Sequence, residues 1–414
     1  EKESYEFFTK VYLSCMYLVS GNKSECCGCT ACQQVCKEQV ITMQVDNEGF
    51  LYPVKDIDKC TNCGLCERVC AFVQPTYNHE QPNVYAAYIK DQKERQKSSS
   101  GALFYTIAKF VINSGGVVFG AALDKKLSVI HQSAQTIEEL TPLRGSKYVQ
   151  SSLGDTFNII KSLLKSGRLV YFTGTPCQVA GLKAFLRKEY SNLLTSDLVC
   201  HGVPSQKLFN LHLKYLEEQY NGKIIDYQFR DNKRWKGSEI TTYIKEEQIF
   251  KRVLPSYDLS PYLYSFMYSL TYRYSCYHCP FAKIPRQGDI TLADFWGVRK
   301  YYPHINASKG VSLVLVNTGL GRQIWENVEK EVMSIKSDVI SASKYNKNLV
   351  TASLMPAVRN GIYERIDNEG YVVIANSVFR TPFYWRIRIR IFIGSLLNDK
   401  VKQLMLNLLA KYKK

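Results

Sequence analysis

The chain has 414 residues, of which 45% are hydrophobic and 22% are charged, and its formal net charge is +17. This composition supplies enough apolar mass for a packed core and excludes a globally disordered chain. Its length corresponds to two or three domains. The sequence has no run of 18 apolar residues, so it predicts no membrane-spanning helix. Its first twenty residues include several charged ones and do not predict a secretory signal.

Cysteine is the unusual residue type: the chain has 14, and ten of them fall within the first seventy residues. Such close clustering indicates metal binding rather than disulfide bonds, so we expect a reducing, cytoplasmic compartment. Two runs share the spacing C-x2-C-x2-C-x3-C of bacterial ferredoxins, in which the fourth cysteine of each run binds the other cluster. The runs are Cys26, Cys29, Cys32, Cys36 and Cys60, Cys63, Cys66, Cys70.

This spacing predicts two 4Fe–4S clusters. Three thiolates on one tight loop reach three irons, and the fourth ligand comes from further away. We therefore assign Cys26, Cys29, Cys32 and Cys70 to one cluster, and Cys60, Cys63, Cys66 and Cys36 to the other. Zinc is the alternative, but it favours two separated C-x-x-C pairs and fits two full runs poorly. Cys15 and Cys27 receive no role.

Four further cysteines follow the two runs: Cys177, Cys200, Cys276 and Cys279. Cys177 follows an apolar strand pattern, with Thr175 as the expected N-cap and Pro176 as the first residue of a helix. Free N–H groups in such a first turn favour a thiolate. Cys200 ends a second apolar run, and the last two form a C-x-x-C pair. These positions admit a third cluster at one sheet edge, buried free thiols or a zinc site.

A polar stretch bracketed by prolines, residues 75–83, predicts a domain boundary. Before it we expect an α+β ferredoxin-like module with two clusters over residues 1–78. After it, strand patterns alternate with helix patterns, which predicts an α/β body with a mixed or largely parallel sheet over residues 79–379. The strand patterns cover 84–89, 117–119 and 169–172, and the helix patterns cover 103–111, 157–164, 176–186 and 208–216.

Nucleotide-binding signatures are absent, since neither G-x-G-x-x-G nor a Walker A sequence occurs. The loop at residues 98–101 opens a helix and could hold a phosphate on its amides, although a simple helix cap is the more common role of such a loop.

The C-terminal segment, residues 380–414, holds nine Lys or Arg residues and one Asp. Residues 385–393 alternate with period two, which predicts a strand, and residues 396–409 carry an apolar helical stripe. One interpretation is a docking strand and helix with a solvated basic face. The other is a basic amphipathic segment that makes peripheral contact with an anionic membrane, which would place the protein at the inner membrane face.

Four segments carry a family resemblance: Gly174–Gln178, Asp197–Pro204, Cys276–Phe281 and Gly288–Gly297. Together they resemble the beta-subunit family of coenzyme F-420 hydrogenases and dehydrogenases, over roughly residues 84–340. The resemblance implies an iron–sulfur flavoprotein that binds FAD beside a 4Fe–4S cluster. It implies that Cys177, Cys200, Cys276 and Cys279 hold this cluster.

The resemblance also implies residues around the FAD. Ser100 with Gly101, Lys147, and Thr175 with Gln178 match the segments expected there, and Lys147 could pair with the pyrophosphate. Asp294 is a further pocket candidate, for which a structural turn is an equal alternative.

Flavin exchanges two electrons as a hydride, whereas clusters exchange one at a time. The resemblance therefore implies an oxidoreductase that links coenzyme F-420, or another low-potential small-molecule substrate, to ferredoxin or another redox protein. The alternative is a non-catalytic electron-transfer subunit of a larger hydrogenase, dehydrogenase or reductase complex. A third interpretation is a redox sensor or nucleic-acid-binding protein. Negative cofactors would offset most of the body's positive charge, so we expect no nucleic-acid partner.

Overall fold

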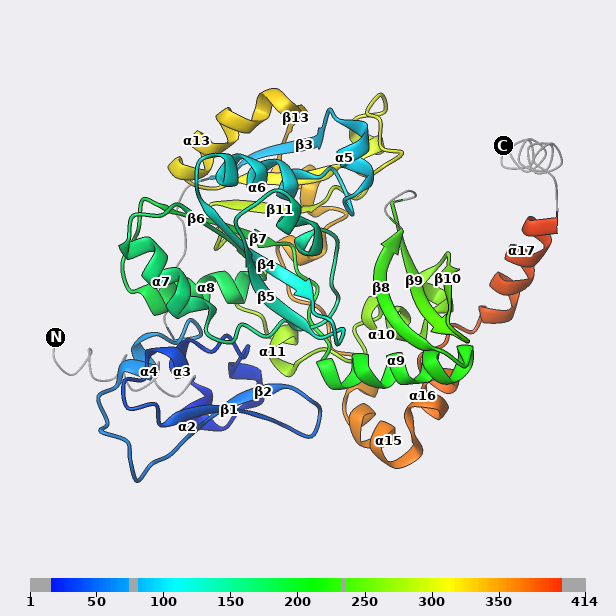
Figure 1. Ribbon diagram of the computed structural model, residues 1–414, viewed down its shortest axis with the longest axis horizontal. Helices are drawn as coiled ribbons and strands as arrows, with labels where there is room; N and C mark the ends of the chain where they lie inside the picture. The colour runs from blue at the N-terminus through cyan, green and yellow to red at the C-terminus, as the bar shows by residue number, and fades with distance from the viewer. Residues whose placement is uncertain (1–15, 74–80, 232–234, 397–414) are drawn as a thin grey trace.

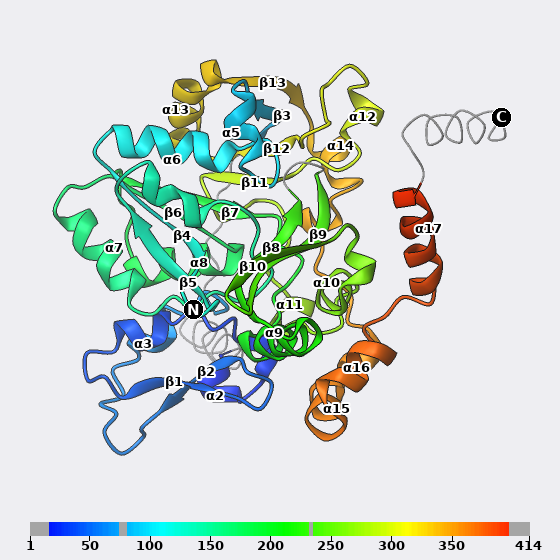
Figure 2. The same cartoon turned by 45° about the vertical axis from the view of Figure 1, so that its right-hand side comes forward.

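The computed structural model describes residues 16–73, 81–231 and 235–396 of the chain. An N-terminal module lies against one end of a large α/β body, and a smaller sheet stands beside that body (Figure 1). The last helices follow the smaller sheet, and the final described helix projects away from the rest (Figure 2).

The N-terminal module contains one β-hairpin, in which β1 (Ile41–Val45) pairs antiparallel with β2 (Leu51–Lys55). The α-helices among its described residues are short: α2 (Tyr17–Ser20), α3 (Ala31–Val35) and α4 (Leu65–Arg68). The helices α3 and α4 each lie within one of the two cysteine runs. The helix α3 also contacts the body, so the first run lies at the junction between module and body.

The body is built on one eight-stranded sheet with the order β13-β3-β12-β11-β7-β6-β4-β5. Its four central strands, β11, β7, β6 and β4, are parallel, and the outer pairs are antiparallel. The strand bounds are β3 (Asn83–Ile89), β4 (Val117–Leu123), β5 (Val129–Ala134), β6 (Val170–Gly174), β7 (Leu193–Leu198), β11 (Ile290–Asp294), β12 (Ser312–Val316) and β13 (Val332–Ser337).

Helices cover both faces of this sheet because its central strands carry apolar side chains on both sides. On β6, Tyr171 packs with α6 (Leu103–Asn113) and α13 (Gly319–Val328), whereas Phe172 packs with α7 (Thr156–Lys165) and α8 (Pro176–Leu186). Adjacent residues of a strand point to opposite faces, so β6 lies between the two helical layers. The helix α5 (Gln92–Gln96) connects β3 to α6.

The smaller sheet has the order β10-β9-β8, with antiparallel pairing throughout. Its strands are β8 (Lys223–Asp231), β9 (Lys236–Lys245) and β10 (Gln248–Leu254). Aromatic side chains from β8 pack on α9 (Gln206–Tyr220) and α10 (Pro261–Met267), and Phe50 and Tyr52 of the N-terminal module belong to the same core. The remaining α-helices are α11 (Tyr274–Tyr277), α12 (Val298–Tyr301), α14 (Val339–Ser343), α15 (Ile362–Glu369), α16 (Tyr371–Ser377) and α17 (Tyr384–Leu396).

The fold class expected from the sequence is confirmed: a ferredoxin-like module is followed by an α/β body whose mixed sheet has parallel central strands. The expected strands and helices between residues 84 and 216 occur as β3, α6, β4, α7, β6, α8 and α9. Thr175 caps α8, and Pro176 is its first residue, as predicted. Most of the boundary stretch lies outside the described residues, and the division into three domains stays a prediction.

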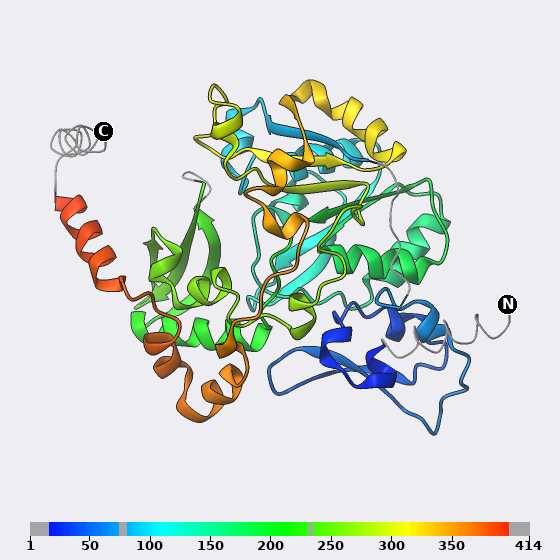
Figure 3. The same cartoon turned by 180° about the vertical axis from the view of Figure 1, so that it is seen from behind.

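The strand predicted for residues 385–393 is wrong, because these residues lie in helix α17. A strand needs a neighbour to satisfy its backbone hydrogen bonds, whereas a helix satisfies them internally. The helix α17 stands away from both sheets (Figure 3), so period-two alternation alone could not produce a strand there. The apolar stripe predicted for residues 396–409 lies outside the described residues from 397 onward.

Candidate iron–sulfur and cofactor site

The two N-terminal cysteine runs have the same local backbone. Gly28 and Thr30 follow the first cysteine of one run at the same offsets as Asn62 and Gly64 in the other, and all four have positive φ angles between 52° and 68°. Such angles curl the chain tightly around its own cysteines. The equivalence between the runs is the pseudo-symmetry that crossed fourth ligands require.

Backbone amides in both runs donate to cysteine sulfur. The N–H of Gly28 donates to Cys26 Sγ at 3.3 Å, and the N–H of Asn62 donates to Cys60 Sγ at 3.4 Å. Hydrogen bonds of this kind stabilise thiolate over thiol, and they adjust the reduction potential of a bound cluster. Both loops are therefore shaped to hold negative sulfur.

The fourth cysteine of the second run lies beside the first run. Burial raises the pKa of the Cys70 thiol to about 12, and the nearby Cys29 and Cys26 add to this effect. Burial also raises the pKa of Cys32, to which Cys29, Cys26 and Cys70 contribute. Cys70 thus neighbours the three cysteines with which we grouped it. Of the other predicted ligand set, Cys63 is exposed, so that set lies near the protein surface.

The four cysteines that follow the two runs gather at one edge of the main sheet. Cys177 is in the first turn of α8, directly after β6, and Cys200 lies two residues beyond β7, which pairs in parallel with β6. Burial raises the pKa of Cys200 to about 12, with contributions from Cys177 and Cys279. The pKa of Cys276 is also raised by burial, and then by Cys200, Cys177 and Cys279. The structure therefore brings these four thiols together.

Cys177 differs from its neighbours because its pKa is lowered, to about 7. The largest cause is a hydrogen bond from Cys27, and the Thr175 hydroxyl, 3.1 Å from Cys177 Sγ, adds a second. The capping hydrogen bond of α8 runs from the Thr175 N–H to Gln178 Oε1 at 3.0 Å. The helix terminus alone predicts a favoured thiolate here, whereas the cysteine spacing indicates no role for Cys27.

None of the described His, Cys, Asp or Glu side chains forms a group of three around a position for a single metal ion. A 4Fe–4S cluster has a different requirement, because each of its four thiolates binds a different iron and the sulfurs stand further apart. Four converging thiols, with amide donors in the first run, fit such a cluster, and bound iron would replace the protons of the thiols.

The four cysteines outside the runs line a cavity of about 420 Å³, which also borders the predicted FAD residues Ser100, Lys147, Thr175, Gln178 and Asp294. This volume is in the range of small-molecule and cofactor sites. Gly101 lies outside the lining. A Cβ at Gly101 would stand 2.3 Å from the backbone oxygen of Ala87, so glycine lets this loop pack closely on β3.

Three polar atoms of the lining residues are buried without a hydrogen-bond partner: Ser100 Oγ, His131 Nδ1 and Arg230 Nη2. Unpaired buried polar atoms cost free energy, and they concentrate where a ligand completes the site. His131 Nε2 donates to the Thr173 backbone oxygen at 3.0 Å, and burial lowers the pKa of this histidine to about 4. Its Nδ1 is therefore an acceptor. These three atoms of the lining are therefore available to pair with a bound ligand.

Lys147 and Asp294, the two charged residues predicted to lie near the FAD, make different contacts. Burial lowers the pKa of Lys147 to about 7, and its Nζ donates to the backbone oxygens of Pro142 and Arg144 at 2.7 and 2.8 Å. Asp294, at the end of β11, forms an ion pair with Arg230 of β8 and accepts a hydrogen bond from Trp235 Nε1 at 2.6 Å. Asp294 thus joins the two sheets. This contact is a structural role, which was the alternative to a role in the FAD pocket.

Family profiles match two parts of the chain. Residues 25–73 match the 4Fe-4S dicluster domain, and residues 167–339 match the family described as the C terminus of the coenzyme F420 hydrogenase/dehydrogenase beta subunit. No curated protein matches the chain. A similar solved structure comes from the F420-reducing NiFe hydrogenase complex of Methanosarcina barkeri. It is 16% identical, with a TM-score of 0.45, and the match covers 71% of this chain and 94% of that chain.

Fold, cysteine geometry and matched domains together define an iron–sulfur electron-transfer protein with a two-cluster module joined to an α/β body. Over residues 167–339 the chain matches the C-terminal part of the beta-subunit family of coenzyme F420 hydrogenases and dehydrogenases. The resemblance carried by the four sequence segments is confirmed.

Proposed function

We propose that the chain is an iron–sulfur flavoprotein oxidoreductase. It binds FAD in the cavity and moves electrons between a two-electron substrate, coenzyme F-420 or another low-potential organic molecule, and a ferredoxin-type carrier. The observation that best supports this proposal is that one cavity borders both the four converging cysteines and the predicted FAD residues. FAD would supply the step between hydride transfer and single-electron transfer.

The residues of the chain bind and orient the cofactors in this proposal. The twelve predicted ligands hold three 4Fe–4S clusters, with the cluster of Cys177, Cys200, Cys276 and Cys279 next to the FAD. Ser100 Oγ and His131 Nδ1 offer unpaired groups to the cofactor, and protonated Lys147 balances part of the pyrophosphate charge. The exposed Cys63 marks the surface at which a ferredoxin or another redox protein would exchange electrons.

The C-terminal helix supports a second element of the proposal, a peripheral contact with an anionic membrane. On α17, Trp385 is 63% exposed and Phe392 is 64% exposed, beside the exposed Arg386, Arg388 and Arg390. Residues 380–396 include no Asp or Glu. Exposed aromatic and basic side chains together suit the interface of an anionic bilayer. None of the described helices combines the length and apolar character that crossing a bilayer requires.

Cofactor content tests the proposal directly. Protein purified without oxygen should contain about twelve irons and one FAD per chain, as three clusters and one flavin require. About eight irons without flavin would overturn the flavoprotein proposal and leave an electron-transfer module. Reduction of an external ferredoxin by the isolated, loaded chain then separates a catalytic protein from a subunit whose chemistry resides on a partner.

A further inference from the structure

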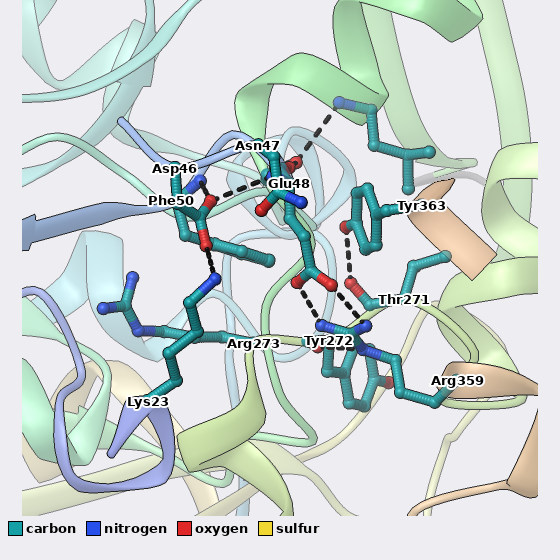
Figure 4. Close-up of polar contacts among 12 residues, drawn as sticks. Lys23, Asp46, Asn47, Glu48, Phe50, Thr271, Tyr272, Arg273, Arg359 and Tyr363 are labelled. Atoms are coloured by element: carbon teal, nitrogen blue, oxygen red, sulfur yellow. Dashed lines mark hydrogen bonds and ion pairs between the residues drawn. The ribbon is translucent and has the colours of Figure 1, made fainter. Parts of the chain in front are cut away.

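Arg273 is a fully buried cation at the junction between the N-terminal module and the body. Its Nε donates to the backbone oxygen of Cys26 at 2.6 Å, and its Nη2 donates to that of Leu51 at 2.9 Å. Its Nη1 donates to Gln150 Oε1, which belongs to the body, at 3.3 Å. The guanidinium also lies 3.9 Å from the ring centre of Tyr52, and Figure 4 shows Arg273 beside Phe50.

The negative partners of Arg273 differ from those of most buried arginines here. Arg359 pairs with Glu48, Arg286 with Asp197, and Arg230 with Asp294. Among the described residues, no carboxylate forms an ion pair with Arg273. The ionisable groups that act on it most strongly are Cys26, Tyr52, Cys27 and Cys276. A buried cation needs a countercharge, and the cysteines around Arg273 would supply it when they bind iron as thiolates.

These sulfurs belong to two different candidate clusters. Cys26 is in the ligand set Cys26, Cys29, Cys32 and Cys70, whereas Cys276 is in the set Cys177, Cys200, Cys276 and Cys279. Arg273 also acts electrostatically on Cys29 of the first set and on Cys177 of the second. One guanidinium therefore faces both sets.

Two further contacts bring the same sets together. A Cβ at Gly181 of α8 would lie 2.8 Å from Cys29 Sγ, so only glycine allows the helix that carries Cys177 to approach the first run this closely. Cys27 is buried between the sets, and its thiol is within hydrogen-bonding reach of the sulfurs of Cys29 and Cys177. The two sites are neighbours.

We propose that Arg273 is a positioning residue that serves as the shared countercharge of these two iron–sulfur sites and raises the reduction potential of both. This inference rests on the proposed function, since it requires the two clusters. A cluster that gains one electron gains one negative charge and no atoms. A cation held nearby, away from water, stabilises that reduced state more than the oxidised state. No cysteine of the set Cys60, Cys63, Cys66 and Cys36 is among the groups that act most strongly on Arg273.

The test is an anaerobic redox titration of the full chain, followed by EPR, for wild type, Arg273→Gln and Arg273→Lys. In Arg273→Gln, the equilibrium constants for reduction of two of the three clusters should each fall at least about tenfold, which is 59 mV for a one-electron couple. The third cluster should keep its potential. Arg273→Lys keeps the charge and should preserve most of both potentials.

Arg95→Gln is the matched control. Arg95 is equally buried and lies against the backbone oxygens of Gly310 and Asn306, with no cysteine among the groups that affect its pKa. Its substitution should leave all three potentials unchanged. If Arg273→Gln leaves both potentials within a few millivolts of wild type, or shifts all three equally, the proposal is wrong.

Loss of clusters from a variant also tests the proposal. If Arg273→Gln loses iron, Arg273→Lys must load normally and keep the wild-type potentials, because it retains the charge. Failure of both variants, with normal loading of Arg95→Gln, would assign Arg273 a purely geometric role and overturn the proposal. Absence of iron from the wild type would overturn the proposed function instead, so the two failures are distinguishable.

Discussion

Glu48 and Arg359 form an ion pair within the protein, although 311 residues separate them in the sequence (Figure 4). Glu48 lies in the loop between β1 and β2, and its Oε1 accepts a hydrogen bond from Arg359 Nη1 at 2.9 Å. The Arg359 Nε donates to the backbone oxygen of Tyr272 at 2.7 Å. This contact therefore holds the N-terminal module, the segment that carries Arg273, and the start of the last helices in one arrangement.

Removal of either charge from this pair should destabilise the protein. Glu48→Gln leaves the Arg359 guanidinium buried without its countercharge, which costs about 3 kcal/mol or more. The midpoint of thermal unfolding should fall by several degrees. Glu369→Gln, which breaks the exposed pair with Arg365, is the control and should change stability much less, because water screens an exposed ion pair. Equal effects of the two substitutions would contradict this expectation.

The iron content of cysteine variants should separate the ligands from Cys27. Cys279→Ser should lose the cluster in the cavity and retain about eight of twelve irons, and Cys63→Ser should lose a different cluster with a similar count. Cys27→Ser should retain all of its iron, because Cys27 contacts ligands without being assigned as one. The measurement is total iron per chain in anaerobically purified protein. A Cys27→Ser variant with four fewer irons would show that the ligand assignment is wrong.

In cluster-free protein, Cys177 should be the reactive thiol of the cavity. Its pKa is about 7, whereas that of Cys200 is about 12, so its thiolate fraction and alkylation rate should rise as pH passes through 7. Cys27→Ala removes the largest cause of this shift and should move the midpoint to higher pH. Mass spectrometry of the alkylated peptides gives both rates. An unchanged midpoint in Cys27→Ala would contradict the role of the Cys27 hydrogen bond.

Flavin affinity should depend on pH through Lys147. Its folded pKa of about 7 means that the ammonium loses its charge between pH 6 and 8, so affinity for the negatively charged FAD should fall severalfold over this range. Lys147→Met should bind FAD more weakly at pH 6 and lose the pH dependence. Titration of flavin fluorescence measures both effects. The exposed Lys126 provides the control, since Lys126→Met should behave as wild type.

The sequence allowed prediction of features that depend on local spacing or on the period of apolar residues. The cysteine spacing predicted that Cys70 lies near the first run, as it does. The start of α8 was predicted from a strand pattern followed by Thr175 and Pro176. No motif or apolar period points to Arg273 or His131, because the roles of these residues depend on burial between distant segments. The alternation from 385 onward was misleading, because none of the described strands lies beside this segment to pair with it.

The helix α17 should bind anionic membranes through its arginines. Full-length protein should bind vesicles that contain phosphatidylserine and should bind neutral phosphatidylcholine vesicles much less, with weaker binding at high salt. Replacement of Arg386, Arg388 and Arg390 by Gln should remove about 1 kcal/mol per residue, on the order of a 150-fold loss of affinity. Arg365→Gln, on the exposed face of α15, is a control that removes one arginine charge elsewhere on the surface, and it should leave binding close to wild type. If binding does not change with the three substitutions or with salt, the arginines of α17 do not bind the membrane and this prediction is wrong.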